Sequence, residues 1–283
     1  MSGRVENRPP SKPAYAEGFG EDAERRTAAY AEVREDSSTA STYKSPAEGA
    51  FPRGSSEDIE LYSVDTGTLC LTWVGLRQQV PRASGRDLKP NWALADFIAP
   101  LASGKRDYIG VFALTTGIGI ESHLARFAAA GDDYSAILLK ALADRLAEAF
   151  AECLHAYLRR TFWGYAAQEN LDNEALIAEA YQGIRPAPGY PACPDHTIKQ
   201  PLFELLDAAK IGMVLTENYA MLPSAAVSGF YFSHPDSRYF GVGKLNSDQV
   251  QSYAQRRGVT LAQAERDLAP CLAYDPKIEQ HRK

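Results

Sequence analysis

The sequence lacks the features that mark several broad functional classes. Its 30 lysines and arginines are outnumbered by 36 aspartates and glutamates, which gives a formal net charge of −6. Nucleic-acid-binding proteins usually present a basic face instead. No apolar run approaches the length that crosses a bilayer, and the first residues, MSGRVENRPPSKP, contain no apolar signal core. We therefore expect a cytoplasmic protein that binds neither nucleic acid nor membranes.

Metal and phosphate motifs are also scarce. The chain has four scattered cysteines without a C-x-x-C spacing: Cys70, Cys153, Cys193 and Cys271. We expect them to be reduced thiols. Cys193, Asp195 and His196 are potential zinc ligands, but no second Cys/His cluster supplies the others. The segment TTGIGIE has glycines without the G-x-G-x-x-G spacing of a dinucleotide site. The sequence thus predicts no metal site.

The composition changes after about 55 residues. Residues 1–56 are rich in Pro, Ser, Glu and Gly and contain one short helical candidate, EDAERRTAAYAEVRED. This composition is typical of a flexible arm or linker. The whole chain has 283 residues and is 45% hydrophobic, enough to bury a core. We expect residues 57–283 to form the folded domain.

The first half of this domain mixes strands and helices. Residues 59–64 and 68–74 are β-rich runs on either side of DTG, which predicts a hairpin. Residues 91–100 predict a short helix or turn. The mostly apolar run 107–116 predicts an interior strand of a sheet. A helix is expected over residues 120–130.

The strongest periodic signal runs from Asp132 to about Tyr165. Asp132 or Asp133 can cap the helix start, where acidic groups also suit the helix dipole. Apolar residues then recur with a period near 3.6, which predicts a long helix with one buried side. That stripe comprises Tyr134, Ile137, Leu138, Ala141, Leu142, Leu146, Ala149, Phe150, Cys153, Leu154, Tyr157 and Leu158.

The second half continues the mixture. A helix capped by Asp172 or Asn173 is expected to end at Gly183. Further predicted elements are a helix at 198–210, strands at 225–234 and 237–245 around the turn HPDS, and capped helices at 247–258 and 260–270. Strands and helices come in groups, so we expect an α+β fold with a largely antiparallel sheet.

The least ordinary segment is the loop GIRPAPGYPACPDHT, residues 183–197. Its four prolines are consistent with a rigid connector. Its other residues also suit a small-molecule site. Arg185 offers a planar fork for a carboxylate, Gly189 lets the backbone approach a ligand, and Tyr190 offers a flat face with a hydroxyl. A stiff loop bearing such groups is a preorganised binding surface.

This loop belongs to a longer pattern. Around RPAPGYPACPDHT the chain contains, in order, LADFIAP, SGKRDYIGVFALTTG, DDYSAILLKALADRLAEAFAECLH, FWGYA and NEALIAEAYQGI before the loop. After the loop come LTENYAMLPSAAVSGFYFSHPDSRYF, DQVQSYAQRRG and LAPCLAYDP. Over residues 57–276 the sequence resembles the C-terminal activation domain of cobalamin-dependent methionine synthase. One departure is Leu222, where we associate a tryptophan with the family.

The resemblance implies a bent, largely antiparallel sheet with flanking helices in one C-shaped domain that binds S-adenosylmethionine (AdoMet). Carried over position by position, it implies these AdoMet contacts: Asp96, Arg185, Ala187, Tyr190, Tyr239, Phe240, Glu148 and Glu179. Arg185 would pair with the ligand carboxylate and Asp96 would accept from its ammonium. Glu148 or Glu179 would balance the sulfonium through space. The aromatic contacts would sandwich the adenine or shield the sulfonium.

The resemblance also implies a reaction. The family repairs cobalamin that has oxidised to an inactive state: a flavodoxin-type donor supplies one electron, and AdoMet then methylates the cobalt. Because the cobalt is the nucleophile, the domain needs no catalytic residue and contributes proximity. No D-x-H-x-x-G cobalamin motif is present. We therefore expect a stand-alone subunit, a fragment or a remnant that reaches cobalamin through a partner module and cannot make methionine alone.

Two alternatives remain open at this point. One is a non-catalytic interaction domain or remnant that keeps the fold but no longer binds AdoMet. The other is an unrelated hydrolase that uses Cys193, His196 and Asp96.

Overall fold

The computed structural model describes residues 41–43, 57–62, 67–79, 91–100 and 107–276. Within those residues, no helix is both long and apolar enough to cross a membrane. Most of the expected arm, residues 1–56, lies outside them. The exception is strand β1 (Ser41–Tyr43), which pairs into the main sheet. The expected boundary after residue 56 stays a prediction.

The main sheet has five strands in the order β3-β2-β1-β4-β7, and every neighbouring pair is antiparallel. The other members are β2 (Ile59–Tyr62), β3 (Leu69–Trp73), β4 (Asp107–Thr115) and β7 (Ala226–Tyr231). A separate ribbon pairs β5 (Val214–Leu215) with β6 (Met221–Leu222). The predicted hairpin and the interior position of β4 are confirmed.

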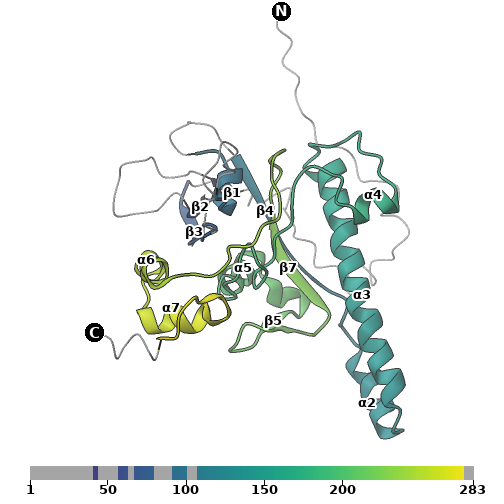
Figure 1. Cartoon of the computed structure of the whole chain (residues 1–283). Coiled ribbons are helices and arrows are strands. Elements are labelled where there is room, and N and C mark those ends of the chain that lie inside the picture. Colours follow the sequence, from purple (N-terminus) through teal and green to yellow (C-terminus); the bar gives the residue numbers. More distant parts are fainter. Residues whose placement is uncertain (1–40, 44–56, 63–66, 80–90, 101–106, 277–283) are drawn as a thin grey trace, which may run out of the picture.

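Alternate residues of β4 and β7 pack into two different hydrophobic clusters. Ile109 and Phe230 belong to one cluster of buried residues, whereas Phe112 and Tyr231 belong to another. Successive side chains of a strand point to opposite faces, so the sheet is covered on both sides here. Helix α3 (Asp133–Tyr157) packs on the Phe112 face and helix α5 (Lys199–Leu206) packs on the other side (Figure 1).

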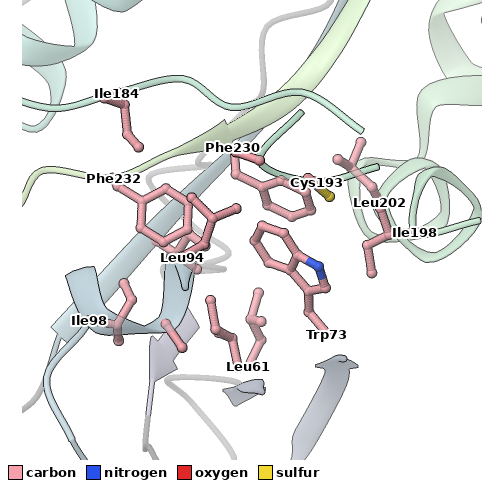
Figure 2. Packing of buried hydrophobic residues seen from close by; sticks show 14 of the residues in the cluster. Leu61, Trp73, Leu94, Ile98, Ile184, Cys193, Ile198, Leu202, Phe230 and Phe232 are labelled. Carbon is pink, nitrogen blue, oxygen red and sulfur yellow. The ribbon is translucent and has the colours of Figure 1, made fainter. Parts of the chain in front are cut away.

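The larger core joins segments from the whole chain (Figure 2). The Trp73 ring from β3 stacks on Phe230 from β7, with ring centroids 4.1 Å apart. Cys193, from the proline-rich loop, and Leu202, from α5, close the same cluster. Burying one such side chain contributes about 1.5–3 kcal/mol. The loop is therefore part of the core as well as of the surface.

Helix α2 (Glu121–Ala129) and helix α3 (Asp133–Tyr157) form a hairpin that extends beyond the sheet (Figure 1). Asp132 caps α3, because its side chain accepts a hydrogen bond from the Ser135 N–H at 3.0 Å. A single π-helical turn, η4 (Leu158–Phe162), follows α3.

The prediction of which side of α3 is buried was wrong. The buried residues are Ala143, Ala147, Ala151 and His155. The apolar stripe lies largely in solvent, with Tyr134 77% exposed and Leu146 60% exposed. Alanines spaced four apart form a smooth face that lets the helix backbone approach β7 closely. The helix therefore packs on the sheet through these small residues and not through the larger apolar ones.

The remaining helices are short. They are η2 (Leu94–Phe97), α4 (Asn173–Ile177), α5 (Lys199–Leu206), η5 (Ala208–Ile211), α6 (Ser247–Arg257), α7 (Leu261–Asp267) and η6 (Ala269–Cys271). Asp172 and Thr260 cap α4 and α7 through their side chains, as expected. The α+β class, with an antiparallel sheet and flanking helices, is confirmed.

One predicted helix end and one predicted strand were wrong. Helix α4 ends at Ile177, well before Gly183, because the chain turns at Glu179, whose φ is +53°. Residues 237–245 form no strand. Their backbone groups bond to loops instead: the Val242 N–H donates to the Pro191 carbonyl at 2.9 Å, and the Gly241 carbonyl accepts from the Gln78 side chain at 3.0 Å.

Candidate functional site

The loop of residues 183–197 is held at both ends. At its start, Ile184 and Phe232 exchange backbone hydrogen bonds of 3.0 Å. In its middle, the Gly189 N–H donates to the Cys193 carbonyl at 2.7 Å. Gly189 has φ +93°, and a Cβ there would lie 2.1 Å from the His196 ring. Only glycine fits this turn, so the loop conformation is strongly specified.

Asp195 fixes the end of the loop. It is 7% exposed and accepts hydrogen bonds from the N–H and Oγ1–H of Thr197, at 2.8 and 2.6 Å. It also accepts from the Tyr253 hydroxyl of α6, with Arg257 of the same helix 3.8 Å away. Asp195, which looked like part of a metal or catalytic feature, therefore anchors the loop.

Cys193 is poorly placed to act as a nucleophile. Its side chain lies in the large core, and burial, with the nearby Asp195 carboxylate, raises the pKa of the thiol. A thiol that stays protonated is neither a good nucleophile nor a ready metal ligand. This argues against the hydrolase alternative.

Arg185 emerges from the loop and points to α3. Its Nη2 lies 2.8 Å from Oε2 of Glu152, and its Nη1 donates to the Tyr181 hydroxyl at 2.7 Å. Its backbone N–H donates to the Tyr239 hydroxyl at 3.0 Å. The side chain is 18% exposed. The cation expected to bind a ligand carboxylate therefore already has a carboxylate partner within the chain.

A buried polar cluster lies beneath Arg185. His155 stacks on Tyr231 of β7 with centroids 5.1 Å apart, and its Nδ1 lies 3.4 Å from Nη1 of Arg185. Burial, together with the charges of Arg159 and Arg185, lowers the pKa of His155 to about 2, so the ring is neutral. Arg159 is fully buried and forms a bidentate pair with Glu169, at 2.8–2.9 Å.

Asp96 also has a partner. It lies at the third position of η2, where its Oδ2 accepts from the Ala93 N–H at 2.9 Å. Both carboxylate oxygens accept from Arg77, at 2.7 and 2.8 Å. The Asp96 side chain is 27% exposed, so a ligand ammonium can reach it.

Tyr239 and Phe240 connect these two charged pairs. Tyr239 contacts the loop through Arg185, and burial raises the pKa of its hydroxyl. Phe240 packs near Phe97, the residue that follows Asp96, with ring centroids 6.4 Å apart. The structure thus joins Tyr239 to Arg185 directly, whereas, among the described residues, Asp96 and Phe240 are linked only through the chain neighbour Phe97.

Ala187 and Tyr190 lie on the outer part of the loop. The Tyr190 N–H donates to the Ala187 carbonyl at 3.2 Å, and the Tyr190 side chain is 61% exposed. Pro191 follows and bonds to Val242, which places this turn beside the segment that contains Tyr239. An exposed ring at this place can cover a flat ligand.

The two glutamates differ in position. Glu179 is exposed, and its charge acts on the Tyr239 hydroxyl, so it lies near the site. Glu148 lies on α3 one turn before Glu152 and lines a hollow of about 200 Å³ with Asp144, Arg145, Ala147 and Ala225–Val227. Glu179 therefore lies near Tyr239, and Glu148 lines a neighbouring hollow.

Three residues of this arrangement were missed by the sequence reasoning: Arg77, Glu152 and Tyr181. Glu152 is four residues after Glu148, so helical spacing from a suspected acidic residue was an available signal. Arg77 is 19 residues from Asp96 along the chain, and no local pattern points to it.

The comparisons with known proteins identify the family of the chain. The family model described as the vitamin B12 dependent methionine synthase activation domain matches residues 31–258. A crystal structure described as the MetH reactivation domain bound to AdoHcy is 50% identical, with a TM-score of 0.75. That match covers 83% of this chain and 69% of the other. The chain therefore belongs to the vitamin B12 dependent methionine synthase activation domain family.

Proposed function

We propose that this chain binds AdoMet and presents its methyl group to cobalamin held by a partner module. The observation that supports this best is the similarity, at 50% identity, to a reactivation domain crystallised with AdoHcy. AdoHcy is AdoMet without the transferred methyl group. A site that holds the product of methyl transfer is suited to hold the donor as well.

The proposed contacts divide by chemistry. Arg185 binds the ligand carboxylate, and Asp96 binds the ammonium. Tyr190 and Tyr239 cover the adenine or the sulfonium, with Phe240 and the Ala187 backbone forming the wall. Glu179 and Glu148 add negative potential that favours the sulfonium cation over a neutral thioether.

The chain supplies position rather than proton transfer. The partner module would supply cobalamin, whose cobalt, once reduced by one electron from a flavodoxin-type protein, would take the methyl group and leave AdoHcy on this chain. The residues of this chain hold the S–CH3 bond in line with that metal, which is an effect of proximity and orientation. In this proposal the protein acts in the cytoplasm and is not a complete methionine synthase by itself.

Calorimetric titration with AdoMet and AdoHcy tests the binding step. Both ligands are expected to bind saturably, and Arg185→Ala is expected to weaken binding at least tenfold. Arg160→Ala is the matched control, because Arg160 is an exposed arginine just after α3. It should bind like the wild type.

The internal pairs Arg185–Glu152 and Asp96–Arg77 favour one competing function. A domain whose charges are already satisfied could have kept the fold for protein contacts alone. Absence of heat and of any thermal shift with both ligands would establish that non-catalytic alternative. If the ligands bind, methylation of cobalamin on a supplied cobalamin-binding module, with an electron donor present, tests the transfer step by the cobalamin absorption spectrum.

A further inference from the structure

The Arg185 guanidinium bonds to neighbouring side chains through only some of its N–H groups. A guanidinium has five N–H donors. Two of them, on Nη1, face the Tyr181 hydroxyl and the His155 ring, and one on Nη2 faces Glu152. Among the described residues, the Nε–H and the second Nη2–H have no partner. Nε and Nη2 are the two adjacent donors that a carboxylate binds in bidentate fashion.

We propose that Glu152 is a positioning residue for ligand binding, because its carboxylate holds the Arg185 guanidinium with the Nε and Nη2 donors turned toward the ligand. The inference rests on the proposed function and deepens it. Glu152 does not touch the ligand in this scheme; it acts through Arg185.

The elements around Glu152 suit this role. Glu152 lies on α3, a 25-residue helix packed on β7, so its carboxylate is carried by a rigid element. Arg185 lies on a loop and has a long side chain with several rotatable bonds. A hydrogen bond from a helix to a flexible cation restricts the cation before the ligand arrives, which lowers the entropy lost on binding.

The cluster is not arranged for maximal stability. Within the described part of the chain, seven buried side-chain polar atoms have no hydrogen-bond partner, and four of them lie in this cluster: Oε1 of Glu152, Nε2 of His155, Nη1 of Arg159 and the Tyr231 hydroxyl. Two of the four, Oε1 of Glu152 and Nη1 of Arg159, lie 3.9 Å apart as an ion pair. Unpartnered buried polar atoms cost stability, and an apolar contact between α3 and β7 would avoid that cost. Polar groups kept at such a cost are expected where they orient a functional side chain.

Two variants of Glu152 separate positioning from electrostatic competition. Glu152→Gln keeps an oxygen acceptor at the same reach, whereas Glu152→Ala removes it. If Glu152 positions Arg185, calorimetry should show the Ala variant binding AdoHcy about tenfold more weakly, equivalent to about 1.4 kcal/mol. The Gln variant should stay within about threefold of the wild type. If Glu152 only competes with the ligand carboxylate, both variants bind more tightly and the inference is overturned.

Glu169→Gln is the control for a purely structural role. It weakens the pair that Glu169 forms with buried Arg159, in the same cluster but without contact to Arg185. It should lower the melting temperature and leave the AdoHcy dissociation constant unchanged. Weaker binding in this variant, equal to that of Glu152→Ala, would show that general loosening of the cluster explains the effect and would overturn the inference.

Tyr181→Phe covers the case in which Glu152→Ala folds poorly, and a double variant tests the coupling between Glu152 and Arg185. Tyr181→Phe removes the hydroxyl bonded to Nη1 and is expected to weaken AdoHcy binding several-fold. Glu152 also lies 3.9 Å from Arg159 and accepts from the Tyr181 hydroxyl at 3.5 Å. If its effect on the ligand runs through Arg185 and not through these contacts, Glu152→Ala in an Arg185→Ala background should change the dissociation constant less than twofold. Unchanged binding in Tyr181→Phe, or an undiminished effect without Arg185, overturns the inference. Failure of the wild type to bind any ligand would instead overturn the proposed function itself.

Discussion

Replacing Asp195 tests whether the proline-rich loop is anchored as the structure indicates. Asp195→Ala removes the acceptor of three hydrogen bonds, two from Thr197 and one from Tyr253. Tyr253 is 1% exposed, so its hydroxyl cannot turn to solvent. Arg257 loses only a distant partner, because Asp267 still pairs with it at 2.6 Å. The loss is therefore one of hydrogen bonds rather than of charge balance.

The magnitude follows from those contacts. Leaving a buried polar group without a partner costs about 1–3 kcal/mol, and the Tyr253 hydroxyl and the Thr197 groups are all affected. We expect Asp195→Ala to lower the free energy of unfolding by about 3 kcal/mol, and Asp195→Asn, which keeps one oxygen, by about 1–2 kcal/mol. For a domain of this size, 3 kcal/mol corresponds to a melting temperature lower by about 6–12 °C.

Urea denaturation followed by tryptophan fluorescence and circular dichroism measures this loss. Asp248→Ala is the matched control, because Asp248 is an exposed carboxylate in the first turn of α6, the helix that contains Tyr253. This control substitution should lower the free energy of unfolding by no more than about 0.3–1 kcal/mol, the size of a helix-dipole interaction. A loss below 1 kcal/mol for Asp195→Ala would refute the anchoring role.

Two further predictions concern pH and the loop turn. The pKa of His155 falls to about 2 in the folded chain, so below its ordinary value near 6.5 the unfolded state binds the extra proton and stability falls with decreasing pH. This residue should lower the free energy of unfolding by up to about 1.4 kcal/mol for each pH unit below 6. Urea midpoints measured over a pH series should therefore depend less on pH below 6 in His155→Gln than in the wild type. The same pH dependence in both proteins would contradict the lowered pKa of His155. Gly189→Ala should cost more than 2 kcal/mol, because the new Cβ meets the His196 ring, whereas Gly243→Ala, at a similar φ of +84° but in open space, should cost about 1 kcal/mol. Equal costs for the two glycines in thermal melts would show that the loop yields to the added methyl group.

Much of the local structure could be predicted because it depends on residues close together in the sequence. The two β-rich runs on either side of DTG pair as β2 and β3, and Asp132 caps α3 through a residue three positions later. The ordered family motifs indicated the fold and the AdoMet-binding hypothesis, and the family membership is confirmed. The predicted contact residues themselves stay predictions.

The prediction for α3 failed for a tertiary reason. Its apolar stripe has the helical period, but period alone does not say which face meets the sheet. The close approach of β7 favours the small side chains of Ala143, Ala147 and Ala151, and the larger residues lie outside. The run at 237–245 looked like a strand by composition, but its backbone hydrogen bonds go to loops.

The sequence by itself determined the charged and aromatic residues available to a ligand and the stiffness of the loop that presents them. Only the tertiary structure decided their partners. Arg185 pairs with Glu152, 33 positions earlier in the sequence (185 minus 152), because folding brings the proline-rich loop onto α3. Asp96 of η2 pairs with Arg77, 19 positions earlier, because folding brings η2 beside the segment that follows β3. A charge interacts with whatever lies within a few ångströms of it, and that distance is set by the packing of the sheet and helices, not by spacing along the chain.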